Sequence, residues 1–212
     1  MLTKTALTCA LFDLVRASLN TGRACSLIGE QALSAYGVPV QTIDRIEVLV
    51  YGPAAGTHLA YGLADTFAWM PLVYHERSSD YVAAGHPSFG ADEPDNFLTM
   101  VTPLDVHVRI FGARNAMQKR MVSMAKNLTL HDISMPVAPL GGVLGLKAKS
   151  PLTIDRATVE RAAESLSAAQ LVAAVAWAET YAPAEAAPLK SAIAVVKKRR
   201  TPIRLFLVKR SR

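Results

Sequence analysis

Residues 27–50, LIGEQALSAYGVPVQTIDRIEVLV, decide the fold of this 212-residue chain. A short apolar run from Cys25 reaches Gly29, and the helix-forming segment Glu30–Tyr36 is then stopped by glycine and proline. From Asp44 to Tyr51, β-branched residues alternate with others, which is the period of a strand with one covered face. We therefore predict a strand, a turn, a short helix and a central strand over this stretch.

Helices and strands alternate on both sides of this stretch. Leu7, Leu11 and Leu14 recur at helical spacing before Asn20, so a first helix is expected there. Further on, periodicity and turn residues predict a helix at 57–69, strands at 72–75 and 97–101 around a polar insert at 76–96, a strand at 104–111, a helix at 113–127 and a weak strand at 129–133. Residues 1–135 are thus predicted to form an α/β domain with a mixed sheet flanked by helices.

The character of the chain changes after Pro136, where helix-forming segments follow one another. They are expected at 140–149, 154–166, 168–181 and 187–196, with prolines near the boundaries. We predict an α/β (α+β) fold in three parts: the α/β domain at 1–135, a helical C-terminal region at 136–196, and a basic, strand-like tail at 197–212. The apolar run Ala168–Ala178 is too short for a membrane-spanning helix, which needs about 20 residues, so no membrane span is expected.

The surplus charge of the chain is concentrated at its C-terminus. The formal net charge is +6, from 23 Lys and Arg against 17 Asp and Glu. Residues 197–212 hold eight basic residues and no acidic one, which leaves 15 basic against 17 acidic residues elsewhere. The eight cations are Lys197, Lys198, Arg199, Arg200, Arg204, Lys209, Arg210 and Arg212. We therefore expect this tail to attach the domain to a partner.

A basic segment of this kind is expected to bind polyanions or a partner protein. Cations placed near phosphates give salt-dependent affinity for nucleic acid through counterion release. The apolar residues between Ile203 and Val208 could add a strand or a docking contact. Structured RNA in a larger particle is the preferred partner, and protein subunits of such a particle are the second. An anionic membrane surface is less favoured, because no amphipathic basic helix is evident.

Two cysteines, Cys9 and Cys25, cannot build a disulfide framework and, with few histidines nearby, do not indicate a zinc site. A reducing compartment is therefore expected. The first 24 residues carry Lys4, Arg16 and Arg23 with one acid, which faintly resembles an organelle transit peptide, although an ordinary first helix fits equally well. We expect the cytoplasm or the mitochondrial matrix.

The motif in residues 27–50 is similar to the signature of the nucleotidyltransferase fold, above all in its minimal and abortive-infection types. In that family a strand ends in Gly-Gly or Gly-Ser, a short helix follows, and a Tyr-Gly-x-Pro-Arg-x-Thr-x-Asp-x-Asp stretch leads into the next strand. The residues in register are Gly29, Gln31, Ala32, Leu33, Tyr36, Gly37, Pro39, Thr42 and Asp44. Downstream, Asp105 fits the family's third carboxylate, and Lys147 and Asp155 fit two later helices of the family. The resemblance spans residues 24–166.

The resemblance implies a magnesium-dependent chemistry that can be checked against this sequence. Nucleotidyl transfer uses two divalent ions held by three carboxylates. Two of these carboxylates must be alternate residues of one strand, because only i and i+2 project to the same face. In this register the partner of Asp44 is Ile46 rather than an acid, and Glu47 is expected on the opposite face.

Further departures weaken the motif. Glu30 follows Gly29 where the family has a small residue, and an acid there would repel a triphosphate. Val40 stands where the family has arginine. The third candidate carboxylate, Asp105, is expected to share an exposed strand face with His107, which also fits an ordinary solvated surface.

These departures favour a protein that has lost metal-dependent chemistry and that uses no cofactor. We expect it to serve as a structural or RNA-associated subunit of a ribonucleoprotein assembly. The alternative is an active transferase that moves a nucleotide from a nucleoside triphosphate to RNA or protein. In that case Asp44 and Asp105 would be the magnesium ligands, and Gly29, Thr42 and Lys147 would bind the nucleotide. A third possibility is a binding module that keeps the nucleotide pocket as a sensor.

Overall fold

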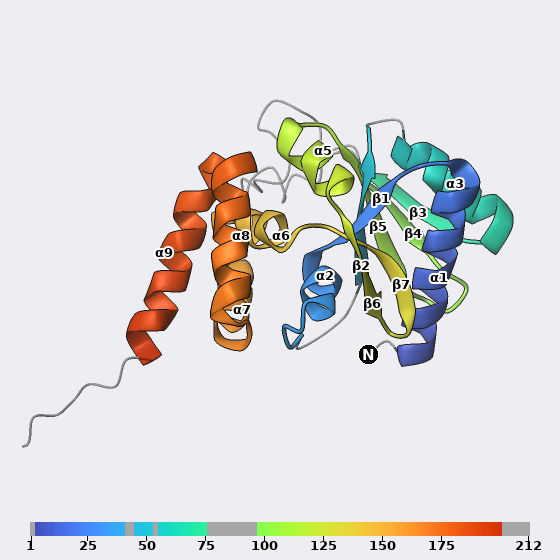
Figure 1. Cartoon of the computed structure of the whole chain (residues 1–212). Helices are drawn as coiled ribbons and strands as arrows, with labels where there is room; N and C mark the ends of the chain where they lie inside the picture. Colours follow the sequence, from blue (N-terminus) through green and yellow to red (C-terminus); the bar gives the residue numbers. More distant parts are fainter. Residues whose placement is uncertain (1–2, 41–44, 53–54, 76–96, 201–212) are drawn as a thin grey trace, which may run out of the picture.

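A mixed seven-stranded sheet forms the centre of the described chain (Figure 1). The structure is a computed structural model, and it describes residues 3–40, 45–52, 55–75 and 97–200. The strands lie in the order β3-β4-β5-β2-β1-β7-β6. Their bounds are β1 (Cys25–Ile28), β2 (Arg45–Tyr51), β3 (Met70–His75), β4 (Phe97–Val101), β5 (His107–Ala113), β6 (Lys126–Leu130) and β7 (Ile133–Val137). Strand β2 is central: it pairs antiparallel with β1 and parallel with β5.

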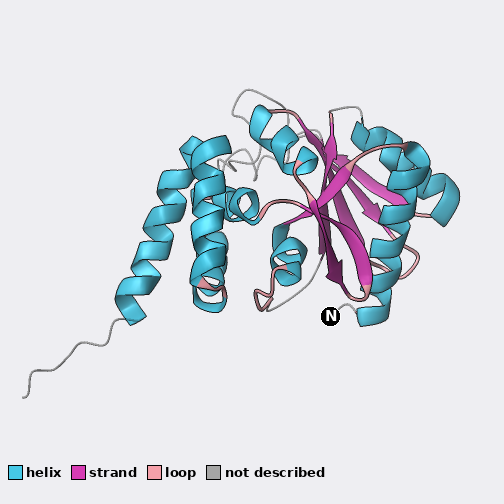
Figure 2. Ribbon diagram, in the orientation of Figure 1, coloured by secondary structure: helices cyan, strands magenta, loops and turns pink. Residues whose placement is uncertain are grey.

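Helices cover both faces of the sheet (Figure 2). One face is covered by α1 (Lys4–Thr21) and α3 (Ala55–Phe67). The other face is covered by α2 (Gly29–Ala35), α5 (Ala116–Ser123) and α6 (Leu140–Lys149). Beyond α6 lie α7 (Thr153–Ser165), α8 (Ala168–Tyr181) and α9 (Pro183–Arg200), which pack on α6 and on one another. The predicted α/β fold, a mixed sheet flanked by helices, is confirmed.

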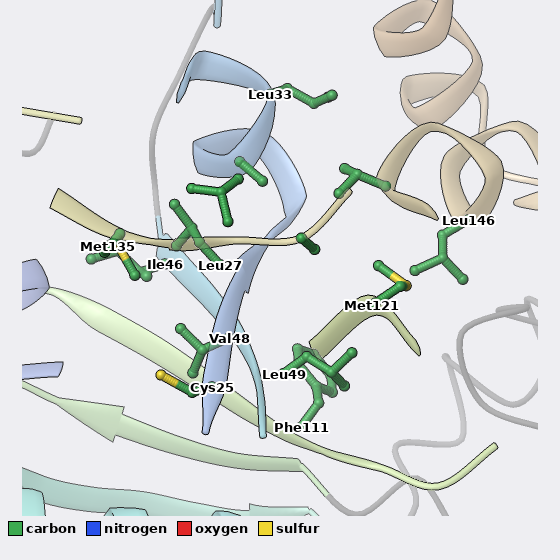
Figure 3. Packing of buried hydrophobic residues seen from close by; sticks show 14 of the residues in the cluster. Cys25, Leu27, Leu33, Ile46, Val48, Leu49, Phe111, Met121, Met135 and Leu146 are labelled. Carbon is green, nitrogen blue, oxygen red and sulfur yellow. The ribbon is translucent and has the colours of Figure 1, made fainter. Parts of the chain in front are cut away.

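The alternation of β2 assigns its side chains to the two faces (Figure 3). Ile46 and Val48 are fully buried and, as alternate residues, share one face of the strand. Leu49 points the other way, where it lies with Phe111 near Met121 of α5. Because alternate residues of a strand share a face, residue 47 projects toward α2, α5 and α6, as Leu49 does.

Side-chain caps account for the start of three helices. Thr3 accepts a hydrogen bond from the first turn of α1 at 3.1 Å. Asn115 and Gln118 form a reciprocal capping box at the start of α5, and Ser167 and Gln170 form another at the start of α8. Each box satisfies backbone N–H groups that have no partner within the helix, which explains why the helices begin where they do.

The predicted helix at 113–127 is wrong at both ends. Ala113 closes strand β5, and Lys126 already belongs to β6. Strand β6 pairs antiparallel with β7, and the turn between them holds His131 and Asp132 at positive φ, 49° and 67°. The predicted strand at 129–133 therefore covers the end of β6, this turn and the first residue of β7. Pairing with β7 and burial of Leu130 outweigh the helix-forming composition of the segment, as tertiary context commonly does.

Several other boundaries also differ from the prediction. The strand expected at 104–111 begins at His107. Helix α9 begins at Pro183 rather than at 187, since proline is tolerated in the first turn of a helix. It runs to Arg200 and so includes the backbone of the first four residues of the predicted tail. The rest of the tail and the polar insert at 76–96 lie outside the described residues.

None of the helices in the described part of the chain combines the length and the apolar character needed to cross a bilayer.

Candidate functional site

The turn between β1 and α2 is shaped by Gly29. Its φ is +69°, a left-handed conformation that favours glycine. A Cβ at Gly29 would clash with Oε2 of Glu47. The missing side chain therefore makes room for the Glu47 carboxylate, which lies directly against the turn.

Glu47 lies between two arginines. Its Oε1 accepts a hydrogen bond from Arg45 Nε at 3.1 Å and forms an ion pair with Arg109 Nη1 at 3.8 Å. Arg45 is the alternate residue on β2, and Arg109 is the register partner of Glu47 on the parallel neighbour β5. The side chains of Glu47 and Arg109 are about four-fifths buried, with exposed fractions of 21% and 20%. One carboxylate and two guanidinium groups thus form a row across the two strands, which we call the Arg45–Glu47–Arg109 row.

This geometry corrects the strand register predicted from the motif. Ile46 was expected to occupy the place of the second carboxylate, but it is buried in the core on the face away from α2. Glu47 was expected on the face opposite to Ile46 and lies there, but this face is the one beside Gly29. The alternate pair on the face of the Gly29 turn is therefore Arg45 and Glu47. The predicted residues Asp44 and Thr42 lie outside the described residues.

The third predicted carboxylate, Asp105, is not part of the strand. It lies in the turn before β5 with φ 58°, and its side chain is 92% exposed. Its Oδ1 lies 3.8 Å from His107 Nε2. On β5 the residue beside Glu47 is Arg109 rather than an acid.

Lys147 of α6 is placed in the same region and is held by carboxylates. Its Nζ donates to Asp155 Oδ1 at 2.7 Å and lies 3.5 Å from Glu30 Oε1. Burial favours the neutral amine and would lower the pKa of Lys147. The opposing effect of the carboxylates is larger: Asp155 acts through its charge and its hydrogen bond, and Glu30 and Glu47 act through their charges. The pKa of Lys147 is therefore raised. The lysine predicted to contact a nucleotide thus has three acidic neighbours in the chain itself.

Glu30 connects α2 to α7. Thr158, which is fully buried, donates its hydroxyl to Glu30 Oε1 at 2.9 Å. Arg161 donates to that hydroxyl at 2.9 Å and lies 3.7 Å from Glu30 Oε2. Glu30 was expected to face a triphosphate and repel it. The structure instead surrounds it with Lys147, Arg161 and Thr158, so its charge stabilises the packing of α2 on α6 and α7.

The described charges of this region have a mixed composition. The cations are Arg45, Arg109, Lys147 and Arg161, and the carboxylates are Glu30, Glu47 and Asp155. No group of three or more His, Cys, Asp or Glu with metal-binding geometry occurs among the described residues. Guanidinium groups beside Glu47 oppose a divalent cation and favour an oxyanion.

Sequence reasoning missed the roles of Arg45, Arg109, Thr158 and Arg161. The alternation of β2 already places Arg45 and Glu47 on one face, and the missing step was that this face, rather than the face of Ile46, lies beside Gly29. For Arg109 and Arg161 no such signal exists in the sequence, because their place depends on the pairing of β5 and the packing of α7.

The predicted tail residues are only partly placed. The last turn of α9 contains the backbone of Lys197, Lys198, Arg199 and Arg200. The side chains of these four residues are not described. Arg204, Lys209, Arg210 and Arg212 lie outside the described residues.

Comparison with known proteins gives matches among solved structures. No family model and no curated protein matches the chain. It is similar to an antigenic nucleotidyltransferase-like protein from Paracoccidioides brasiliensis, with 10% identity and a TM-score of 0.52 over 94% of this chain and 90% of that one. It is also similar to the solution structure of the antibiotic-resistance factor ANT(2'')-Ia, with 11% identity and a TM-score of 0.54 over 93% of this chain and 98% of that one. At these identities the likeness concerns the fold. The chain has the nucleotidyltransferase fold, as its motif predicted.

Proposed function

We propose that this chain is a nucleotidyltransferase-fold protein that performs no metal-dependent transfer and works as an RNA-associated or structural subunit of a larger assembly. The observation that carries the proposal is the Arg45–Glu47–Arg109 row beside the Gly29 turn. Two-metal transfer needs a set of carboxylates at one place. Here two of the three side chains in the row are cations.

The electrostatics of the row oppose a divalent ion. An arginine side chain keeps its charge at all ordinary pH values. A metal ion bound to Glu47 would therefore lie within a few ångströms of two permanent positive charges, since both guanidinium groups contact Glu47 Oε1. At an effective dielectric constant near 20, two like unit charges about 4 Å apart repel by about 4 kcal/mol, and a divalent ion doubles this. The proposed function accordingly requires neither magnesium nor a nucleoside triphosphate.

The assembly role rests on the charge distribution of the sequence. Residues 1–196 are close to neutral, with 15 basic against 17 acidic residues, whereas the last sixteen residues hold eight cations. Such a segment supplies affinity for phosphates that does not depend on base sequence and that falls with salt. RNA is the partner that this chemistry fits best.

The transfer half of the proposal is tested by incubation with labelled nucleoside triphosphates and magnesium, with RNA or protein as acceptor. We expect no incorporation of label above that of a heat-inactivated sample. Transfer that disappears in Asp44→Ala or Asp105→Ala would establish the active-enzyme alternative and overturn the proposal.

The tail half is tested by the salt dependence of binding to a structured RNA. A variant with Arg204, Lys209, Arg210 and Arg212 changed to Gln removes four cations of the tail. We expect weaker binding, and a slope of log K against log salt that is smaller by roughly 3, because each phosphate that is no longer neutralised lowers the slope by about 0.7–0.9.

A matched control removes the same number of charges from exposed positions of the domain: Lys4, Arg16, Arg23 and Lys119, all to Gln. This control should keep the wild-type slope. Equal losses of affinity in the two variants would mean that RNA binding, if present, does not use the tail.

A further inference from the structure

The outer side of α1 carries an exposed row of residues that includes two large apolar side chains. Its members are Thr5, Cys9, Phe12, Arg16 and Leu19, and all five are exposed. They follow one another at spacings of four and three, which places them on one side of the helix. Phe12 is 46% exposed and Leu19 is 76% exposed. We call these five residues the α1 ridge.

The charges beside the two apolar side chains are positive. The guanidinium group of Arg16 lies over the ring of Phe12, 5.7 Å from its centroid. Arg23 is exposed directly after Gly22, the residue that caps the C-terminus of α1. The single acidic residue of α1, Asp13, is turned away from the ridge and accepts a hydrogen bond from Trp69 Nε1 at 3.0 Å. Arginine and apolar side chains therefore alternate along the ridge without an acid between them.

Helix α3 extends the same outer layer of the molecule (Figure 1). It approaches α1 closely at Gly62, where an added Cβ would lie 2.8 Å from Thr21 Cγ2. Tyr61, the residue before this glycine, is 65% exposed. Tyrosine combines an apolar ring with a polar tip, a property that suits a boundary between water and lipid. Asp65 is an exposed acid of α3, so the two arginines beside the apolar side chains leave a surplus of one positive charge.

These features fit an anionic lipid surface better than they fit RNA or a folded protein. A helix that lies on a bilayer presents apolar side chains to the acyl groups and cations to the lipid phosphates. RNA is bound by cations and by aromatic rings on which bases stack, so the exposed aliphatic Leu19 would add nothing to RNA binding. A folded protein needs a matching surface of about 800 Å² on each partner, whereas a fluid bilayer adapts to a ridge.

The sequence alone does not show this pattern, because apolar residues lie on both sides of α1. Leu7, Leu11 and Leu14 are buried against the sheet, and only their removal from view leaves the alternation of the outer side. The faint resemblance of the first 24 residues to a transit peptide has the same origin, since it also rests on cations among apolar residues. In the structure this segment is a helix of the folded domain.

We propose that the α1 ridge docks this protein on the surface of an anionic lipid bilayer. Phe12 and Leu19 enter the boundary of the acyl groups, and Arg16 and Arg23 contact the lipid phosphates. The inference goes beyond the proposed function and does not depend on it, because the ridge shares no residue with the basic tail or with the Arg45–Glu47–Arg109 row.

The test is co-sedimentation of the full chain with vesicles made of equal parts of phosphatidylcholine and phosphatidylserine. Phe12→Gln/Leu19→Gln is expected to lower the partition coefficient about tenfold or more, because two apolar side chains no longer leave water. Arg16→Gln/Arg23→Gln is expected to lower it about fivefold for each arginine, and to have no effect with vesicles of phosphatidylcholine alone. Every variant keeps the tail, so any attraction of the tail to the vesicles is the same throughout.

Matched control variants are available on the other side of the sheet. Ile154 on α7 and Val172 on α8 are 70% and 65% exposed, so Ile154→Gln/Val172→Gln removes a similar amount of exposed apolar surface. Lys119 on α5 and Lys190 on α9 are also exposed, and Lys119→Gln/Lys190→Gln changes the net charge as the arginine variant does. In a protein docked through α1 these helices lie away from the bilayer (Figure 1). Both controls are expected to bind the vesicles as the wild type does.

Three results would overturn the inference. The first is an equal loss of vesicle binding in Phe12→Gln/Leu19→Gln and its control, and the second is an equal loss in Arg16→Gln/Arg23→Gln and its control. The third is unchanged vesicle binding in both ridge variants, as expected if the ridge serves RNA or a protein. Glutamine is a good helix former, so α1 should persist in each variant, as circular dichroism checks. If a double variant is unfolded, Leu19→Gln against Val172→Gln makes the same comparison with single changes.

Discussion

Gly29 and Glu47 depend on each other in a way that a motif comparison does not reveal. The glycine adopts a left-handed turn, and its missing Cβ leaves the space that the glutamate carboxylate fills. The motif correctly singled out Gly29, because a glycine between a strand and a short helix has a backbone reason. The motif took the face of Ile46 as the face of the site, because alternation alone does not show which face of a strand lies beside a turn.

Gly29→Ala is expected to destabilise the protein more than Gly22→Ala. Both glycines have positive φ, +69° and +62°, so both substitutions cost about 1–2 kcal/mol of backbone strain. At Gly22 no atom lies within 4 Å of the new Cβ, whereas at Gly29 the Cβ meets Glu47. Urea denaturation measures the difference. In a Glu47→Ala background the cost of Gly29→Ala should fall to that of Gly22→Ala, and an unchanged cost would contradict this packing.

Lys147→Met is expected to cost about 3 kcal/mol of unfolding free energy, because it removes the 2.7 Å ion pair of Lys147 with the buried Asp155. Lys4→Met is the control. Lys4 pairs with Asp132 at 67% and 84% exposure, and exposed pairs contribute about 0–1 kcal/mol. Comparable losses of stability in the two variants would contradict the structure around Lys147.

The contribution of Lys147 should also depend on pH. Its pKa in the folded protein is raised above the ordinary 10.5. A raised pKa means that the stabilisation is fully present below pH 10.5 and is lost as the pH rises through the folded value. The difference in unfolding free energy between wild type and Lys147→Met should therefore shrink at alkaline pH. A difference that widens instead would show that the ion pairs do not hold the charged form.

Helix α6 is the element that joins the sheet to the C-terminal helices, and its glycines permit close packing. A Cβ on Gly141 would clash with the backbone oxygen of Ala174 on α8. Backbone atoms cannot move aside as a flexible side chain can. The separation of α6 and α8 is thus set by a residue without a side chain, and α6 in turn carries Lys147 to the site.

Gly141→Ala is expected to destabilise the protein by about 1–3 kcal/mol, because α6 and α8 must move apart. Gly56→Ala on α3 is the matched control. There the new Cβ would lie 3.5 Å from Ile110 Cγ2, an ordinary contact, so higher helix propensity should make it neutral or stabilising by up to about 1 kcal/mol. Thermal and urea unfolding compare the two, and a neutral Gly141→Ala would contradict the close packing of α6 on α8.

Across the whole molecule, the fold was more accessible from the sequence than the site. The helices and strands described between residues 25 and 51, and the C-terminal helices apart from the ends of α9, were predicted because hydrophobic period and glycine or proline boundaries are local signals. The β6–β7 hairpin was missed because its turn uses His131 and Asp132 at positive φ instead of glycine. The Arg45–Glu47–Arg109 row joins two strands that are distant in the chain, so its composition follows from the pairing of β2 with β5.

The central claim is that cations have taken the place of metal-binding carboxylates beside the Gly29 turn. It is tested most directly by electron paramagnetic resonance of Mn²⁺, an ion that favours carboxylate ligands, with the wild type, Glu47→Gln and the double variant Arg45→Asp/Arg109→Asp. The account predicts that the wild type and Glu47→Gln bind Mn²⁺ equally weakly, and that the double variant, with carboxylates flanking Glu47, binds it more tightly. Tight binding by the wild type that is lost in Glu47→Gln would contradict the account.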